Sequence, residues 1–191
     1  MGDTPIHSRK YFYGVSPEKF GESPEKTMKT EEIKLNFGET KELVLKNEDL
    51  TMSVNLVGEA SEISITGRFL LTGNTKRVIN VTLNHLGENT KGRINIKAVL
   101  KDKAKLYFNG CLVVNKKAIG TDTYLSNRNL LVGEEAFVES VPSLEIKNAK
   151  VKASHGVTIG KVNEDEIYYM ESRGLSHTDA EQLITFGFLE S

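Results

Sequence analysis

Short runs of alternating apolar and polar residues dominate the chain between residues 31 and 161. Apolar positions recur at every second residue, which is the period of a β-strand with one buried face. The runs are Ile33-Leu35-Phe37, Leu43-Leu45, Met52-Val54-Leu56, Ile63-Ile65, Phe69-Leu71, Val78-Ile79-Val81-Leu83, Ile94-Ile96, Leu106-Phe108, Leu112-Val113-Val114, Leu130-Leu131-Val132, Phe137-Val138, Leu144-Ile146 and Val157-Ile159. The pattern therefore predicts a mainly β core over residues 31–161.

The connections between these runs favour a stacked architecture over hairpins. Only Asn109-Gly110 has the sequence of a tight hairpin turn, and it can equally form a corner. A loose repeat places an alanine after each of several polar connections, at Ala60, Ala104, Ala118, Ala136 and Ala149. Small residues at regular corners suit coils that stack on one another. We therefore expect a parallel β-helix, in which each coil buries its inner face against the coils above and below.

The period changes from two residues to helical spacing after residue 161. Two capping patterns and one glycine stop mark this region: Asn163 with Glu166, Ser176 with Asp179, and Gly174. They predict a helix over about residues 164–173 and a second short helix after it. Residues 162–191 are thus expected to form a helical tail that caps one end of the stack.

Composition narrows the class of protein. A chain of 191 residues can bury a core of its own. The single Cys111 cannot form an intrachain disulfide, and no apolar stretch reaches the roughly 20 residues needed to cross a bilayer. We therefore expect a cytoplasmic protein with no membrane partner. Residues 1–30 mix Gly, Pro, Ser and charged residues around Tyr11-Phe12-Tyr13 without any period, which predicts a disordered or loosely docked segment.

Charge is unevenly distributed, although the formal net charge is only −1. This balance argues against general nucleic-acid binding. The stretch from Lys91 to Lys117 is basic. The tail is acidic, with Glu164, Asp165, Glu166, Glu171, Asp179, Glu181 and Glu190. Such a tail either suits a basic groove on another protein or is simply solvated charge.

Candidate chemistry centres on His155, and no catalytic motif accompanies it, so we predict a protein that is not an enzyme. Ser154 and His155 are neighbours on a predicted strand, so their side chains point to opposite faces and cannot act as nucleophile and base. No phosphate-loop sequence is present. His155 precedes Gly156 near the switch to helical spacing, where its imidazole can face a partner, a metal ion or a local hydrogen-bond acceptor. Cys111 opens an apolar run, which favours a structural thiol.

Several short motifs carry a family resemblance. They are Arg128-Asn129-Leu130-Leu131-Val132, Pro142-Ser143-Leu144-Glu145-Ile146, Val151-Lys152-Ala153-Ser154-His155-Gly156 and Tyr168-Tyr169-Met170-Glu171-Ser172-Arg173-Gly174. Their order and spacing resemble the core of the SufB/SufD family, the scaffold subunits of the SUF machinery that assembles iron–sulfur clusters. With similar motifs upstream, the resemblance covers roughly residues 50–189. It implies a right-handed parallel β-helix with a C-terminal helical subdomain.

The resemblance also implies partners. Family members pair through their β-helices, so a homodimer or a heterodimer with a SufB/SufD paralogue is expected. They bind an ABC-type ATPase, SufC, through the helical tail. By this resemblance the segment expected to touch the ATPase includes Tyr169, Arg173 and Gly174. The strand Leu130-Leu131-Val132 is expected near the dimer seam, and His155 matches a histidine implicated in cluster assembly at the subunit interface.

An iron–sulfur cluster on this chain would have to be shared. One cysteine and four histidines cannot supply a four-thiolate site. We therefore expect no cluster on the isolated chain and a transient, subunit-shared cluster with His155 as a candidate ligand. Asn127 falls where SufB carries its sulfur-accepting cysteine, and Ala153 replaces a cysteine often found before Ser-His-Gly. A SufB-type role in receiving sulfur is therefore not expected.

Two other functions remain compatible with the pattern. A cluster-free interaction module would keep the solenoid and the ATPase contact without the metal function. A β-helix that acts on polysaccharide would need clustered acids or aromatic residues along one face, and the chain has no Trp to stack on a sugar.

Overall fold

The computed structural model describes residues 28–191, which form ten strands and two helices. The strands are β1 (Lys29–Leu35), β2 (Thr40–Leu45), β3 (Leu50–Leu56), β4 (Glu62–Leu71), β5 (Lys76–His85), β6 (Lys91–Leu100), β7 (Lys105–Val114), β8 (Asp122–Leu131), β9 (Phe137–Ile146) and β10 (Lys152–Lys161). The helices are α1 (Glu164–Ser172) and α2 (His177–Glu190). The sequence predicted a disordered or loosely docked segment over residues 1–30. Residues 1–27 lie outside the described residues, and strand β1 begins at Lys29.

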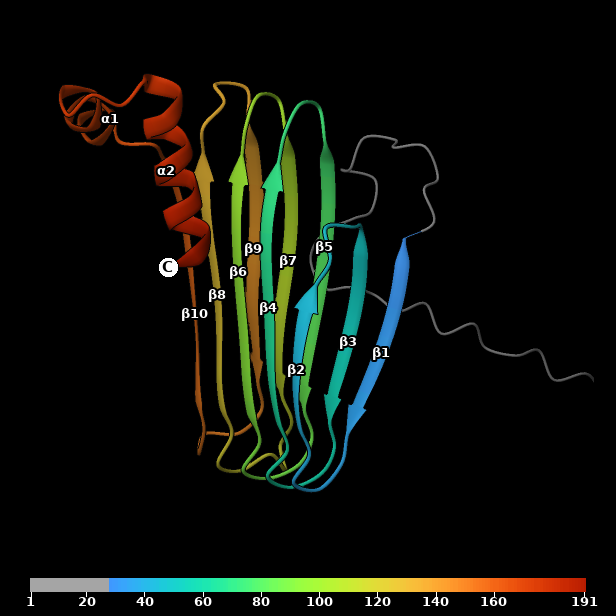
Figure 1. The fold of residues 1–191 in the computed structure, drawn as a ribbon. Helices are drawn as coiled ribbons and strands as arrows, with labels where there is room; N and C mark the ends of the chain where they lie inside the picture. Colours follow the sequence, from blue (N-terminus) through green and yellow to red (C-terminus); the bar gives the residue numbers. More distant parts are fainter. Residues whose placement is uncertain (1–27) are drawn as a thin grey trace, which may run out of the picture.

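The strands alternate between two parallel sheets, which confirms the predicted stack of coils. One sheet has the order β1-β3-β5-β7-β9 and the other the order β10-β8-β6-β4-β2, so consecutive strands never pair with each other (Figure 1). Leu50 pairs with Ile79, so one coil there takes 29 residues. The step lengthens to 32 residues between Lys105 and Phe137, because both corners of that coil are longer. The structure is a β-solenoid.

The core lies between the two sheets and consists of matching inward positions in successive coils. Ile65, Ile94 and Leu125 stack in register and are completely buried. Glycines make room for the largest side chains: a Cβ at Gly110 would lie 2.9 Å from the ring of Phe108. Asn109-Gly110 is therefore neither a hairpin turn nor a corner, as the sequence suggested, but part of the middle of β7. Burial of these side chains is the main favourable term for the stack.

The corners combine buried alanines with glycines that permit close approach of the backbone. Ala104 and Ala118 are completely buried, in keeping with the predicted small corner residues. A Cβ at Gly58 would overlap the backbone of Asn36 and Phe37, which belong to the corner of the preceding coil. The sequence repeat of alanines thus marks only part of the corner, because the tightest coil-to-coil contacts require glycine.

A buried hydrogen-bond chain links neighbouring corners and contains His85, the last residue of β5. The Thr121 hydroxyl donates to the carbonyl oxygen of Ala118 (2.9 Å) and lies 3.3 Å from the Thr90 hydroxyl, which lies 2.8 Å from Nδ1 of His85. Because the Thr121 proton is already used, the Thr90 hydroxyl can donate to Thr121 or to the Gly87 carbonyl oxygen (3.4 Å), and we assign it as the acceptor of a hydrogen bond from His85 Nδ1–H. The neutral ring therefore carries its proton on Nδ1. Its Nε2 atom is buried without a partner, beside Gly92.

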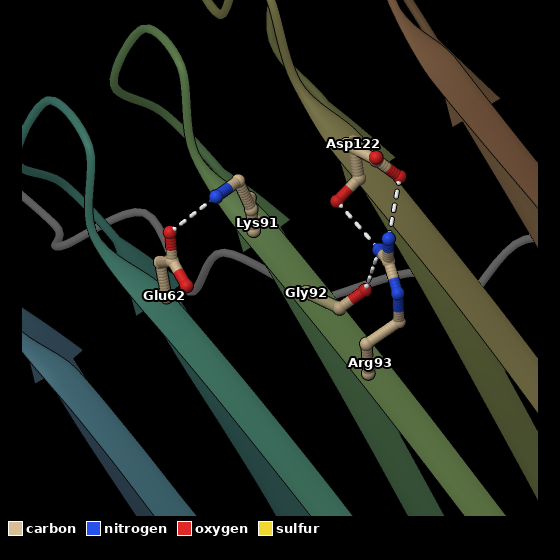
Figure 2. A network of polar contacts seen from close by, with 5 residues as sticks. All are labelled: Glu62, Lys91, Gly92, Arg93 and Asp122. Atoms are coloured by element: carbon tan, nitrogen blue, oxygen red, sulfur yellow. Dashed lines mark hydrogen bonds and ion pairs between the residues drawn. The ribbon is translucent and has the colours of Figure 1, made fainter.

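An alternating charge row crosses the outer face of the even-numbered sheet. Glu62, Lys91, Asp122 and Lys152 occupy paired positions on β4, β6, β8 and β10. Figure 2 shows the Lys91 ammonium 2.6 Å from the Glu62 carboxylate. It also shows Arg93, which donates to the carboxylate (2.8 Å) and the carbonyl oxygen (2.9 Å) of Asp122. Opposite charges on adjacent strands are favourable and like charges are not, so this row supports the observed strand register.

Both helices begin, and α1 ends, where the capping residues and Gly174 indicated, whereas α2, with 14 residues, is longer than the short helix that was predicted. Asn163 accepts a hydrogen bond from the backbone of Asp165 (3.0 Å), and the backbone turns at Gly174 with φ of +97°. Ser176 accepts from the backbone N–H of Asp179 (3.2 Å) and donates to its carboxylate (2.6 Å). Helix α2 lies along the outer face of the even-numbered sheet (Figure 1), so the prediction that the helical tail caps one end of the stack is wrong. Neither helix has the length and apolar content of a membrane-spanning segment.

Candidate functional site

The last coil of the solenoid exposes side chains that earlier coils bury. Strands β9 and β10 are the outermost members of the two sheets at the end opposite β1 (Figure 1). Ile146 occupies the inward position that Val114 holds one coil earlier, yet it is 45% exposed, whereas Val114 is completely buried. Ile159 pairs with buried Asn129 and is 48% exposed. The inner surface of the last coil is therefore an apolar surface open to another molecule.

The first described coil is built differently. Its inward positions carry Lys29 and Glu31 opposite the buried Leu50 and Met52, and the Lys29 ammonium lies 2.6 Å from the Glu31 carboxylate. Lys41 holds the corresponding place on β2. Inward-pointing charges on an edge strand oppose pairing with another chain, because such pairing would bury them. Ile33 and Leu35 fill the remaining inward positions of β1, so among the described residues the first coil combines charged and apolar inward side chains, whereas the last coil exposes mainly apolar ones.

His155 lies at this open end. It sits on β10 and pairs with Leu125, so it continues the inward row that Ile94 and Leu125 fill in earlier coils. Its side chain is exposed, and within residues 28–191 the ring makes no hydrogen bond or ion pair. Both ring nitrogens are therefore available to a ligand. The local hydrogen bond that the sequence left open for His155 is not present.

The interior becomes polar immediately behind His155. Thr123, Asn127 and Asn129 occupy inward positions of β8, where earlier coils carry mainly apolar residues. The Asn127 amide donates to the Ser140 hydroxyl across the core (2.8 Å). Three buried oxygen atoms on these side chains, Thr123 Oγ1, Asn127 Oδ1 and Asn129 Oδ1, have no hydrogen-bond partner among residues 28–191. Sequence reasoning singled out Asn127 only by resemblance and missed the other two, although all three share the inward parity of one strand.

Cys111 does not belong to a metal-binding arrangement of the described residues. Cys111 lies half-buried on the outer face of the odd-numbered sheet. The pKa of its thiol is raised, mainly by burial. The hydrogen bond with Ser143 opposes this rise, and the charge of Glu145 adds to it. A raised pKa disfavours the thiolate that acts as nucleophile or ligand. In the described part of the chain, no three His, Cys, Asp or Glu side chains converge on a position that could hold a metal ion.

The helical hairpin presents a second exposed surface. Tyr169 is exposed on α1, and the Arg173 guanidinium lies 5.3 Å from the centre of its ring. Gly174 forms the turn to α2, so the structure brings these three predicted residues together. On α2, Leu183 and Phe186 are 53% and 65% exposed. Sequence reasoning missed these two, because apolar residues at helical spacing are ordinarily assigned to a buried face.

The opposite side of α2 is fixed to the solenoid. Lys101 forms an ion pair with Glu181 at 2.6 Å, and the Arg128 guanidinium lies 5.5 Å from the centre of the Phe188 ring. Ala180 is completely buried. Because α2 is anchored in this way, its exposed apolar residues are held at a defined place on the molecule.

The segment Leu130-Leu131-Val132 lies at the end of β8, one strand inside the edge. Leu130 and Leu131 pair with Gly160 and Lys161 of β10, and Leu130 is only 8% exposed. Gly160 lies five positions after His155 on β10, which corresponds to about 16 Å along a strand. The structure therefore places the predicted dimer-seam residues and His155 in different parts of the last two coils. The role of each stays a prediction.

The fold and these surfaces define a β-solenoid protein with one open end and a C-terminal helical hairpin. The chain matches the SUF system FeS cluster assembly, SufBD core domain over residues 39–188, and it belongs to this family. This confirms the resemblance seen in the motifs. The description of this family refers to iron–sulfur cluster assembly by the SUF system.

Individual relatives agree with this assignment. The chain is 36% identical over 136 residues to the iron-sulfur cluster assembly protein SufD of Escherichia coli, covering 71% of this chain and 32% of that protein. It is 27% identical over 132 residues to a chloroplastic SufBD family protein of Arabidopsis thaliana, covering 69% and 23%. It is 29% identical over 106 residues to SufB of Bacillus subtilis, covering 56% and 23%. The chain thus spans a third or less of the length of these relatives.

Proposed function

We propose that this chain is a non-catalytic scaffold subunit of SUF-type iron–sulfur cluster assembly. In this proposal its last coil pairs with a second solenoid, either a copy of itself or a SufB/SufD paralogue. Its helical hairpin docks an ABC-type ATPase related to SufC, and His155 contributes to a transient cluster at the subunit interface. The observation that carries the proposal is the open last coil. There the apolar side chains in inward positions and the His155 imidazole are exposed together at the end of the solenoid.

Pairing at the last coil is supported by the contrast between the two ends. Ile146 and Ile159 would become buried against a partner, whereas the charges of Lys29 and Glu31 protect the other end. Replacing Ile159 with Lys should therefore shift the assembly toward monomers in light-scattering chromatography. The matched control is Leu70→Lys, which places the same charge at a similarly exposed leucine, 49% exposed, away from the last coil. An unchanged oligomeric state in the Ile159 variant would remove the last coil as the interface.

Docking of the ATPase is supported by the anchored hairpin. Exposed aromatic and apolar residues held on a fixed helix are typical anchors in protein interfaces. Phe186→Glu should abolish co-purification with the ATPase. Phe37→Glu is the control, because Phe37 is 75% exposed and lies at a corner of the first coil. Full retention of the ATPase by the Phe186 variant would contradict docking through α2.

The cluster role of His155 requires its own test. His155→Ala should lower the yield of anaerobic iron–sulfur reconstitution on the assembled complex, measured by visible absorbance and bound iron. His177→Ala serves as the control, because it removes another exposed imidazole on the hairpin, 3.1 Å from Glu171. If the His155 variant reconstitutes as well as the unmodified complex, the cluster-free interaction module becomes the better description.

A further inference from the structure

A second charged row crosses the outer face of the even-numbered sheet, near the opposite ends of its strands from the alternating row. Arg68, Lys97 and Arg128 occupy paired positions on β4, β6 and β8. All three carry positive charge, whereas the row Glu62, Lys91, Asp122 and Lys152 alternates in sign. Like charges directly opposite one another on neighbouring strands are destabilising. The same face thus contains one row whose charges cancel and one whose charges do not.

Glu190 of α2 lies near Lys97, but no carboxylate of the described residues forms an ion pair with this cationic row. Among residues 28–191, none of the three side chains forms an ion pair: Lys97 donates to the Ser191 hydroxyl (3.2 Å) and Arg128 lies over the Phe188 ring. Arg68 is exposed and makes no hydrogen bond with the described residues. The pKa of Lys97 is lowered, first by burial and then by the charges of Arg128 and Arg68. The nearby charge of Glu190 offsets only part of this decrease. The row therefore retains excess positive charge.

Hydrogen-bond donors of another kind lie directly beside the cations. Thr66, Asn95 and Ser126 occupy the next outward row, two residues earlier on the same three strands. Their side chains make no hydrogen bonds within the described part of the chain. Strands lie about 4.8 Å apart and residues i and i+2 about 7 Å apart. Three cations and three neutral donors are thus arranged on a flat patch of about 7 by 10 Å.

We propose that this patch binds a diphosphate group. Arginine forks bind phosphate oxygens with two parallel hydrogen bonds, and hydroxyl and amide groups can donate to the remaining oxygens. A diphosphate concentrates several negative charges in a group shorter than the row, and the long side chains of Arg68, Lys97 and Arg128 can converge on it. An acidic peptide fits less well, because the row runs across paired strands and offers no free strand edge for backbone pairing. The site lies apart from the exposed face of α2, but it borders the C-terminal end of that helix, where Lys97 contacts Ser191 and Arg128 contacts Phe188.

Thermal unfolding at low ionic strength tests the proposal with sodium pyrophosphate as the probe. Because a ligand that binds only the folded state raises Tm, pyrophosphate should raise the Tm of the unmodified chain. Arg68→Gln should abolish this rise and should itself leave Tm unchanged or higher without the anion, since it relieves repulsion. Lys91→Gln is the matched control: it removes the same charge from the same face, and it should keep the rise.

Titration calorimetry then measures affinity and identifies the source of the diphosphate. Arg68→Gln should weaken pyrophosphate binding at least tenfold, while Lys91→Gln should leave it unchanged. Adenosine diphosphate binding as tightly as pyrophosphate would assign the site to an organic diphosphate, and weaker binding would assign it to the free anion. Absence of pyrophosphate binding, or binding that survives Arg68→Gln, would overturn the proposal.

Discussion

Replacing His85 should make the stability of this protein less dependent on pH. The ring is completely buried, its Nδ1–H donates to Thr90, and Nε2 has no acceptor for a second proton. Protonation in the folded state would place an unpaired charge in the core, beside Gly92 and the positive charge of Arg93. The unfolded chain has no such obstacle, so the two states bind protons at different pH values.

The size of the effect follows from the two pKa values. Burial, assisted by the charge of Arg93, lowers the pKa of His85 from 6.5 to about 4. The unfolded state therefore takes up a proton as the pH falls through 6.5, and the folded state does so only near pH 4. Stability is highest above pH 6.5 and falls as the pH is lowered. Between pH 7 and pH 5 this group alone should cost about 2 kcal/mol of unfolding free energy.

Urea unfolding followed by circular dichroism at pH 7 and pH 5 measures this loss. His85→Asn keeps an amide donor for Thr90 but cannot titrate, so its loss between the two pH values should be smaller by about 2 kcal/mol. Any constant destabilisation from the substitution cancels in this comparison. Parallel losses in the His85 variant and the unmodified chain would refute the buried neutral ring.

Two further substitutions test the corners and the alternating charge row. Gly58→Ala should lower the unfolding free energy by about 3 kcal/mol in urea titrations, because its Cβ would overlap the backbone at Phe37. Gly160→Ala is the control and should change the unfolding free energy by less than about 0.5 kcal/mol, because no atom lies within 4 Å of its Cβ. Equal effects of the two substitutions would contradict the close approach of the corners. Lys91→Gln should lower the unfolding free energy by about 0.5 kcal/mol at low salt, because its ion pair with Glu62 is solvent-exposed. This loss should become smaller at high salt, where the charges are screened. A loss that does not depend on salt would instead indicate a packing effect.

The parallel stack and both helix starts were predictable from the sequence, because they depend on local signals. Alternation identifies strands, and hairpin signals were almost absent between them. Asn163 and Ser176 have the side chains that satisfy the first backbone N–H groups of a helix, and both do so in the structure. Gly174 adopts the left-handed conformation that ends a helix.

The length of the strands was harder to predict. The runs Leu106-Phe108 and Leu112-Val114 read as two segments, but they form the single strand β7 because Gly110 holds the inward position between them. Strand β8 was recognised only at its end, since Thr123, Asn127 and Asn129 fill its inward positions. A polar residue in such a position breaks the alternation in sequence, and only the pairing with neighbouring coils shows that it faces inward. The environment of His155 is likewise set by coils far away in the chain.

The charged inner side chains of the first coil give the molecule a direction. An assembly unit with two adhesive ends can add copies without limit and form a fibre, whereas a unit with one adhesive end stops after a single addition. Lys29, Glu31 and Lys41 make one end unsuitable for addition, and Ile146 and Ile159 make the other suitable. If two molecules join through their last coils, as proposed, both adhesive ends are used, and the product is a closed pair that does not polymerise.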